Sequence, residues 1–341
     1  MDTDTSKYLE SLNNDKLTLV DNLNEMGVEA TNNETFTSLV PKVLDIQGGS
    51  EVEIHDCTRL FMMGTRLDSL NALLNICKNV TSMYYMFYSC NELVDINISN
   101  FDTSSVTNMG LCFYNCSALQ NLDVSNFNTS NVTNFNSMFL GCQNLIILDV
   151  AGFNTSNAID VSSMFKSCSK VTNLNVTGFN TSNVTKFSSM FSGCSSLTSL
   201  DVSNFDTSNA EYMDYMFSGC SSLTSLDVSN FDTSKVTNMF GMFQNCSNLT
   251  KLDISSFSTG SGNYNNSSFF RGCTNLVEVI INNANLFEIT HTNVFDGTPI
   301  ANGTGYVYVP DNMVETYKSA TNWSIYAGQI KGISELPTGE A

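Results

Sequence analysis

Phenylalanine and cysteine recur at an almost constant spacing through most of the chain. Each of eight cysteines has a phenylalanine three residues before it, and successive cysteines lie 26 residues apart, with one step of 27. These cysteines are Cys90, Cys116, Cys142, Cys168, Cys194, Cys220, Cys246 and Cys273. The pattern extends backwards to Phe61, and Phe295 begins a last, degenerate copy. The sequence therefore predicts about nine repeats of one structural unit.

Within each repeat, hydrophobic and polar residues alternate over a short stretch. Leu200 and Val202, for example, alternate with polar neighbours, which predicts one half-buried strand per repeat. A turn at Asp206-Thr207-Ser208-Asn209 follows, then a second extended piece and a tight Met-Phe corner such as Met190-Phe191. A unit this short cannot bury its own apolar side chains, so the repeats must stack. The predicted fold is a mainly β solenoid of about nine coils with a parallel sheet.

The repeat pattern L-x-x-L-x-V-x-x-F, preceded by F-x-x-C, resembles the BspA-like bacterial leucine-rich repeat family. The resemblance runs from about Phe61 to the C-terminus and implies a leucine-rich-repeat solenoid that binds partners through its surface, without catalytic residues. The stretch Gly305 to Asp311, with Tyr317 and Trp323, is similar to the cap that closes such arrays. We therefore expect a solenoid over residues 48–300 and a C-terminal cap over 301–341, in which Asp311 is the N-cap of a short helix.

The first 47 residues follow a helical pattern. An a/d seam with 3-4-3-4-3 spacing predicts one helix that ends at Gly27, and a second short helix is expected over residues 35–44. The seam consists of Leu9, Leu12, Lys16, Leu19, Leu23 and Met26. Residues 1–47 are therefore assigned to a short α-helical segment, which either covers the first coil or forms an oligomerising stalk, with a homotrimer favoured.

A second resemblance concerns the same segment. The residues from Lys16 to Val43 include Met26-Gly27-Val28 and Phe36-Thr37-Ser38-Leu39, and they are similar to the helical leader of tail fibre and other structural proteins of phages of Gram-positive hosts. This resemblance implies a role in a phage tail, with the leader bound to other tail or baseplate proteins. A virion location would also agree with a start that has no basic region and no apolar signal-peptide core.

Charge and composition narrow the class of function. The chain has 14 basic and 33 acidic residues, so its net charge is 14 − 33 = −19, which argues against nucleic-acid binding. The chain has only two histidines, His55 and His291, so few side chains are suited to acid/base catalysis or metal binding. No apolar run approaches the ~18 residues that span a membrane. We expect no enzyme activity, no cofactor, no metal site and no membrane insertion.

The cysteines and the acidic residues are expected to be structural. No CxxC motif occurs, and a 26-residue spacing cannot bring four sulfurs to one zinc, so the repeated cysteines are interpreted as buried thiols. Cys112 is assigned to the core, and Cys57 and Cys77 are predicted to be the exposed thiols. One column of acids and amides comprises Asn97, Asp123, Asp149, Asn175, Asp201, Asp227 and Asp253, and a second comprises Asp102, Asn128, Asn154, Asn180, Asp206 and Asp232. The first column could bind calcium, but hydrogen bonding of its side chains to neighbouring backbone is favoured. The second column is typical of Asx turns.

Candidate binding residues are large apolar side chains at positions where the repeat usually has Ser, Asn or Gly. They are Tyr84, Tyr85, Tyr88, Leu111, Tyr114, Tyr212, Tyr215 and Phe240. Such rings are typical of a sugar-stacking or protein-binding surface. The alternative is that the rings only cover neighbouring coils.

The sequence thus favours a non-enzymatic recognition protein of a phage tail, which binds a glycan or protein on the host cell surface. The alternative is a secreted or cell-surface bacterial adhesin of the BspA-like family. A polysaccharide-degrading enzyme has less support, because no pair of carboxylates stands out from the repeat background.

Overall fold

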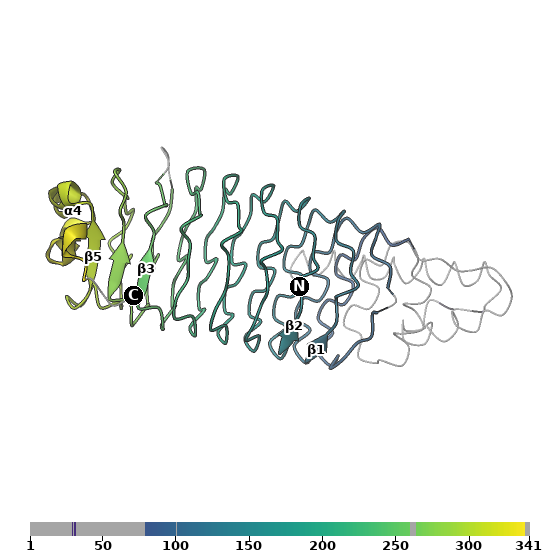
Figure 1. Cartoon of the computed structure of the whole chain (residues 1–341). Helices are drawn as coiled ribbons and strands as arrows, with labels where there is room; N and C mark the ends of the chain where they lie inside the picture. The colour runs from purple at the N-terminus through teal and green to yellow at the C-terminus, as the bar shows by residue number, and fades with distance from the viewer. Residues whose placement is uncertain (1–28, 30, 32–78, 100, 260–263, 338–341) are drawn as a thin grey trace.

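The computed structural model describes residues 79–99, 101–259 and 264–337, together with Glu29 and Thr31. In this part the chain winds into a solenoid of stacked coils, as the repeat predicts (Figure 1). The helical segment 1–47 with its seam and leader, the coil that begins near Phe61, and Cys57 and Cys77 lie outside the described residues.

Parallel hydrogen bonding joins successive coils along two lines. On the first line, β1 (Asn121–Leu122) pairs with β2 (Ile147–Leu148), and a four-stranded parallel sheet has the order β3-β4-β5-β6. Its strands are β3 (Lys251–Asp253), β4 (Glu278–Ile280), β5 (Tyr306–Val309) and β6 (Ile330–Gly332). On the second line, single parallel bridges connect Ser82, Asn108, Asn134, Asp160, Lys186, Tyr212, Asn238 and Asn265 in that order. Each coil therefore rests on its neighbour through backbone hydrogen bonds on both sides of the core.

The core is a column of stacked phenylalanine rings. Eight successive ring pairs have centroid distances between 5.0 and 5.9 Å and interplanar angles of 15° or less. The column consists of Phe87, Phe113, Phe139, Phe165, Phe191, Phe217, Phe243, Phe270 and Phe295. Because each ring packs between its equivalents in the coils before and after it, the burial of one coil depends on both neighbours.

The repeated cysteines line the same core as buried thiols. Seven of them, from Cys116 to Cys273, donate from Sγ to the carbonyl oxygen of the phenylalanine 29 or 30 residues earlier, at 2.9–3.2 Å. Cys112 is also buried. Burial raises the pKa of the Cys142 and Cys220 thiols to about 12. The prediction of buried thiols is confirmed for all nine cysteines of the described residues.

A line of buried threonines closes the turn that follows each strand position. The threonines are Thr103, Thr129, Thr155, Thr181, Thr207 and Thr233, each 0–1% exposed. Each hydroxyl donates to a backbone carbonyl of the next coil at 2.7–3.1 Å. The Thr207 hydroxyl also accepts a hydrogen bond from the N–H of Asp232, the residue to which it donates. A polar side chain thus replaces strand pairing where the chain turns away from the sheet.

The last part of the chain adds β5 and β6 to the parallel sheet and covers the end of the core. It also contains η1 (Asp311–Met313), α4 (Val314–Ser319), η2 (Ser324–Gln329) and η3 (Ile333–Glu335). Trp323 is buried, with its indole N–H bonded to the carbonyl of Phe287 at 2.7 Å, and the Tyr317 hydroxyl accepts the N–H of Phe287 at 2.9 Å. These contacts attach the segment to the last coils.

The prediction that Asp311 is a helix N-cap is wrong. Asp311 is the first residue of η1, where no side-chain cap bond forms, and α4 begins three residues later. Its carboxylate instead accepts hydrogen bonds from the backbone N–H and the hydroxyl of Ser334. The side chain therefore connects the start of η1 to η3, because tertiary contacts offer it two donors that the helix does not.

Candidate binding surface

In each coil a tight turn segment alternates between buried and outward-facing residues. In the coil that begins at Ser82, Met83, Met86 and Phe87 are fully buried, whereas Tyr84, Tyr85 and Tyr88 are half-buried. Local bonds such as Met86 N–H to the Met83 carbonyl tighten the turn, and bonds such as Met83 N–H to the Asn108 carbonyl attach it to the next coil. We call the outward positions equivalent to 82, 84, 85 and 88 in successive coils the turn face.

The backbone of these turns requires a left-handed conformation at the position of Tyr85. The equivalent residue of all eight described coils has φ between 54° and 61°. Five of the eight are serine or glycine: Ser137, Ser163, Ser189, Gly241 and Ser268. The other three are Tyr85, Leu111 and Tyr215. A residue with a Cβ atom in this region costs on the order of 1–2 kcal/mol, which only glycine avoids, and a bulky side chain is the least usual choice there.

Four tyrosines of two adjacent coils form one group, which we call the first aromatic cluster. Tyr84 and Tyr85 meet edge to face with centroids 4.3 Å apart, and Tyr85 and Tyr88 do so at 4.9 Å. Tyr88 and Tyr114 stack across the coils at 4.6 Å with an interplanar angle of 5°. Leu111 is half-buried in the same turn as Tyr114. The structure thus joins Tyr84, Tyr85, Tyr88 and Tyr114 in one chain of ring contacts.

The remaining candidate residues form a second aromatic cluster farther along the same face. Tyr215 and Phe240 meet edge to face at 5.0 Å across two coils, and both are half-buried. Tyr212, in the coil of Tyr215, is 39% exposed and takes part in the bridges between coils. Four coil steps separate Tyr114 from Tyr212, or roughly 19 Å at about 4.8 Å per step.

Two glycines of the turn face accommodate these rings. A Cβ atom at Gly110 would lie 3.2 Å from Cδ2 of Tyr84, and a Cβ atom at Gly241 would lie 3.0 Å from Cε1 of Tyr215. Each ring therefore lies against the glycine of the following coil. The rings cover neighbouring backbone, as the alternative interpretation holds, and they also keep part of their surface exposed.

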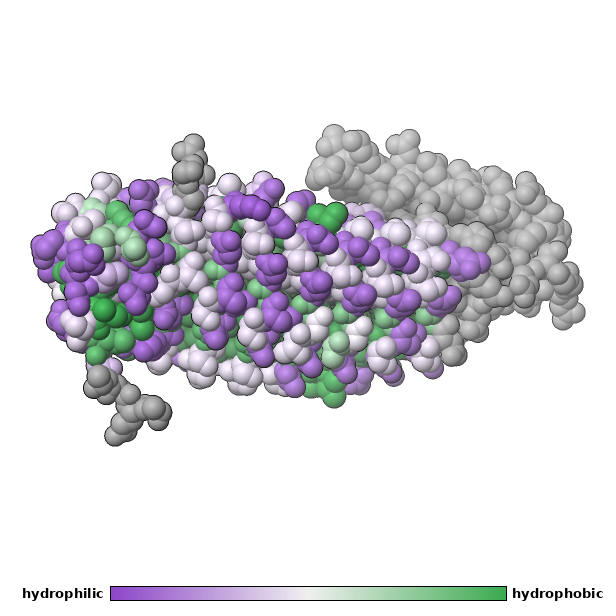
Figure 2. Space-filling view, turned by 45° about the horizontal axis from the view of Figure 1, so that its top comes forward, coloured by the Kyte–Doolittle hydropathy of each residue, from purple (hydrophilic) through white to green (hydrophobic). Residues whose placement is uncertain are grey.

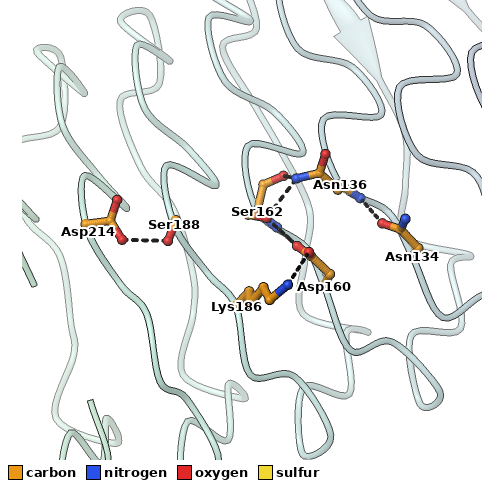
Figure 3. A network of polar contacts seen from close by, with 7 residues as sticks. All are labelled: Asn134, Asn136, Asp160, Ser162, Lys186, Ser188 and Asp214. Atoms are coloured by element: carbon orange, nitrogen blue, oxygen red, sulfur yellow. Dashed lines mark hydrogen bonds and ion pairs between the residues drawn. The ribbon is translucent and has the colours of Figure 1, made fainter. Parts of the chain in front are cut away.

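A polar strip follows the first aromatic cluster along the turn face and reaches the coil of Tyr212 and Tyr215 (Figure 3). It consists of Asn134, Asn136, Asp160, Ser162, Lys186, Ser188 and Asp214. The amide of Asn136 donates to the Ser162 hydroxyl at 2.8 Å, and the Ser188 hydroxyl donates to Asp214 at 2.6 Å. Lys186 forms an ion pair with Asp160 at 3.4 Å. Rows of hydrophilic residues that pass from coil to coil are also visible on the face shown in Figure 2.

The two columns of acids and amides are Asx turns. Every member accepts the backbone N–H of the residue two positions later, at 2.9–3.1 Å in the first column and 2.8–3.1 Å in the second. These bonds confirm the structural interpretation of both columns. Hydrogen bonds from Ser203 lower the pKa of Asp201, and those from Ser229 lower the pKa of Asp227. Among the described residues, no group of three or more His, Cys, Asp or Glu side chains could hold a metal ion.

The structure also exposes apolar residues that the sequence analysis did not single out. Ile147, the first residue of β2, is 66% exposed, and Ile146 just before it is 50% exposed. Val94 is 45% exposed at the position equivalent to Ile146 two coils earlier. These positions carry Thr and Ser in several other coils, such as Thr198 and Ser199. That comparison between coils is the signal that could have identified them.

The stacked coils define a leucine-rich-repeat solenoid. Two overlapping matches, over residues 56–175 and 159–284, relate the chain to DUF285, described as Mycoplasma protein of unknown function. Together they cover more than half of the chain, which therefore belongs to this family. The match supports the resemblance to BspA-like repeats.

Two further comparisons were made. A leucine-rich repeat protein from Bacteroides ovatus, known from a crystal structure, is similar at 21% identity with a TM-score of 0.33. The match covers 68% of this chain and 65% of the Bacteroides ovatus protein. It therefore spans less than two thirds of the length of that protein. A search of curated proteins returned no match. Within the described residues, no helix is both long and apolar enough to cross a membrane.

Proposed function

We propose that this protein is a non-enzymatic adhesion protein that acts at a bacterial surface or after secretion, and that it binds its target through the two aromatic clusters of the turn face. The membership in a BspA-like repeat family supports this class. The observation that carries the proposal is the presence of Tyr85, Leu111 and Tyr215 at positions with left-handed backbone. Strained residues of this kind cluster at functional sites, and the large apolar side chains stand where the other coils have serine or glycine.

The second candidate is a receptor-binding role on a phage tail, in which the segment 1–47 would attach the protein to other tail or baseplate proteins. It rests on the leader motif from Lys16 to Val43 and on the seam that favours a homotrimer, and both lie outside the described residues. The two functions share the recognition of a cell-surface glycan or protein. They differ in what the N-terminal segment binds, so co-purification with tail proteins would favour the second candidate.

The experiment that tests the proposal compares adhesion of labelled protein to target cells for the parent chain and for the double variant Tyr85→Ser, Tyr88→Ser. Stacking contributes about 1 kcal/mol per ring, or about 2 kcal/mol for both, so the double variant should bind roughly thirtyfold more weakly. Its stability should change by about 1 kcal/mol or less, because both rings are only half-buried and serine or glycine occupies the position of Tyr85 in five of the eight described coils.

Two control variants separate binding from folding. Ile147→Ser removes an exposed apolar side chain far from the turn face and should leave both adhesion and stability unchanged. Phe191→Ser removes a fully buried ring of the core column and should unfold its coil. Adhesion of the tyrosine double variant equal to that of the parent would refute the proposed binding surface.

A further inference from the structure

We propose that the ligand of the turn face is an uncharged linear glycan that lies along the solenoid axis and contacts both aromatic clusters and the polar strip. This inference rests on the proposed function and specifies the chemistry of its target. It follows from three features of the face: the spacing of its coils along the solenoid axis, its aromatic and hydrogen-bonding groups, and its charge.

The first feature is the period of the surface. Backbone bonds such as Phe113 N–H to the Met138 carbonyl at 2.8 Å and Phe139 N–H to the Met164 carbonyl at 2.9 Å hold successive turns at the spacing of paired strands, about 4.8 Å. This step is close to the length of one pyranose residue in an extended β-linked chain. An extended peptide advances by only about 3.3 Å per residue, so it would lose register within a few coils. A polymer of sugar rings can place one unit on each coil.

The second feature is the set of groups that the face offers. The two clusters present aromatic rings at either end, and the polar strip presents amides, hydroxyls and carboxylates. Sugars have apolar C–H faces that pack on rings and hydroxyl groups that bond to such polar side chains. A peptide added as a strand would need free backbone N–H groups. In these turns the N–H groups of Tyr85 and Phe87 already bond to carbonyls of the next coil.

The third feature is the charge. From Asn134 to the coil of Tyr215 the turn face carries two acidic residues, Asp160 and Asp214, and two basic residues, Lys166 and Lys186, so its local balance is 2 − 2 = 0. Lys186 is paired with Asp160. The whole chain has a net charge of −19, which repels polyanions at long range, and the face has no surplus of basic residues to compensate. An uncharged glycan fits this surface better than a uronic-acid or sulfated one.

The test measures binding of the full chain to a printed series of linear oligosaccharides, from disaccharides to octasaccharides. The series contains uncharged β-linked glucose, mannose and N-acetylglucosamine chains, and uronic-acid and sulfated chains of matched length. We expect binding to at least one uncharged series, with an affinity that rises with length until the chain can reach both clusters. Acidic chains should bind at least about tenfold more weakly.

Variants test whether one glycan contacts both clusters. Tyr85→Ser and Tyr215→Ser lie in different clusters. Each removes one ring and should weaken octasaccharide binding by about fivefold but remove only part of the disaccharide binding. Ile147→Ser should bind like the parent. Absence of binding to every uncharged series, preference for acidic chains, or an affinity that does not depend on length would overturn the inference.

Adhesion to treated cells distinguishes failure of this inference from failure of the proposed function. Periodate oxidation of cell-surface glycans should abolish adhesion, and protease treatment should not. If protease abolishes adhesion, periodate does not, and Tyr85→Ser still weakens it, the aromatic surface binds a protein and the glycan is refuted. If Tyr85→Ser and Tyr215→Ser adhere like the parent, the proposed function itself is refuted.

Discussion

The buried threonine line gives the sharpest test of how the coils are held together. Thr207 is 1% exposed, and its hydroxyl donates to the carbonyl of Asp232 at 2.9 Å and accepts the N–H of the same residue at 2.8 Å. Thr207→Val keeps the size and shape of the side chain but removes both hydrogen bonds. Each bond contributes about 1 kcal/mol net, and the groups left without a partner add a further cost. We expect Thr207→Val to lower the free energy of unfolding by about 2 kcal/mol or more.

Thr207→Ser provides the complementary change, because it keeps the hydroxyl and removes one methyl group. Loss of a buried methyl costs about 1 kcal/mol, so serine should be less destabilising than valine. If the hydroxyl were unimportant, the order would reverse, because valine conserves the buried volume and serine does not. The order of the two variants therefore tests the role of the hydrogen bonds independently of their absolute size.

The measurement is urea unfolding followed by circular dichroism, with the slope m compared among variants so that midpoints can be read as stability. The matched control is Thr198→Val, which makes the same substitution at an exposed position. Its free energy of unfolding should stay within about 0.5 kcal/mol of the parent. A Thr207→Val variant that is as stable as Thr207→Ser or more stable would refute the argument.

Two further predictions follow from the ionisable groups. Because burial raises the pKa of thiols such as Cys142 and Cys220 to about 12, iodoacetamide should label none of the nine described cysteines in the native protein at pH 7 to 8, and all of them after denaturation. Native labelling of these cysteines would contradict their burial. The lowered pKa of Asp227 implies a stabilising contribution that is fully present above the ordinary pKa of about 3.9 and is lost as the pH falls through the lower folded value. Asp227→Asn should keep the Asx turn and the stability at pH 7 but reduce the loss of stability on acidification, so an acid-unfolding curve identical to that of the parent would contradict this assignment.

The sequence by itself determined the fold and the structural roles that recur in every coil. The spacing of Phe and Cys requires stacked units, since one coil cannot bury a ring such as Phe191 alone. The same repetition identified the thiols as core residues, and it identified the acids and amides as turn residues, because an Asx turn depends only on the backbone two residues away. These features are local or identical in each repeat, so a pattern along the chain is enough to predict them.

Only the tertiary structure decided what depends on contact between coils. The left-handed backbone at Tyr85, the position of its neighbour Tyr84 over Gly110, and the double hydrogen bond of Thr207 all involve the following coil. Asp311 likewise bonds to Ser334, a partner 23 residues away, instead of capping its own helix. Partners at these separations are brought together by stacking, whose geometry is set by backbone hydrogen bonds between coils. The sequence shows which residues break the repeat, but only the stacked coils show what they touch.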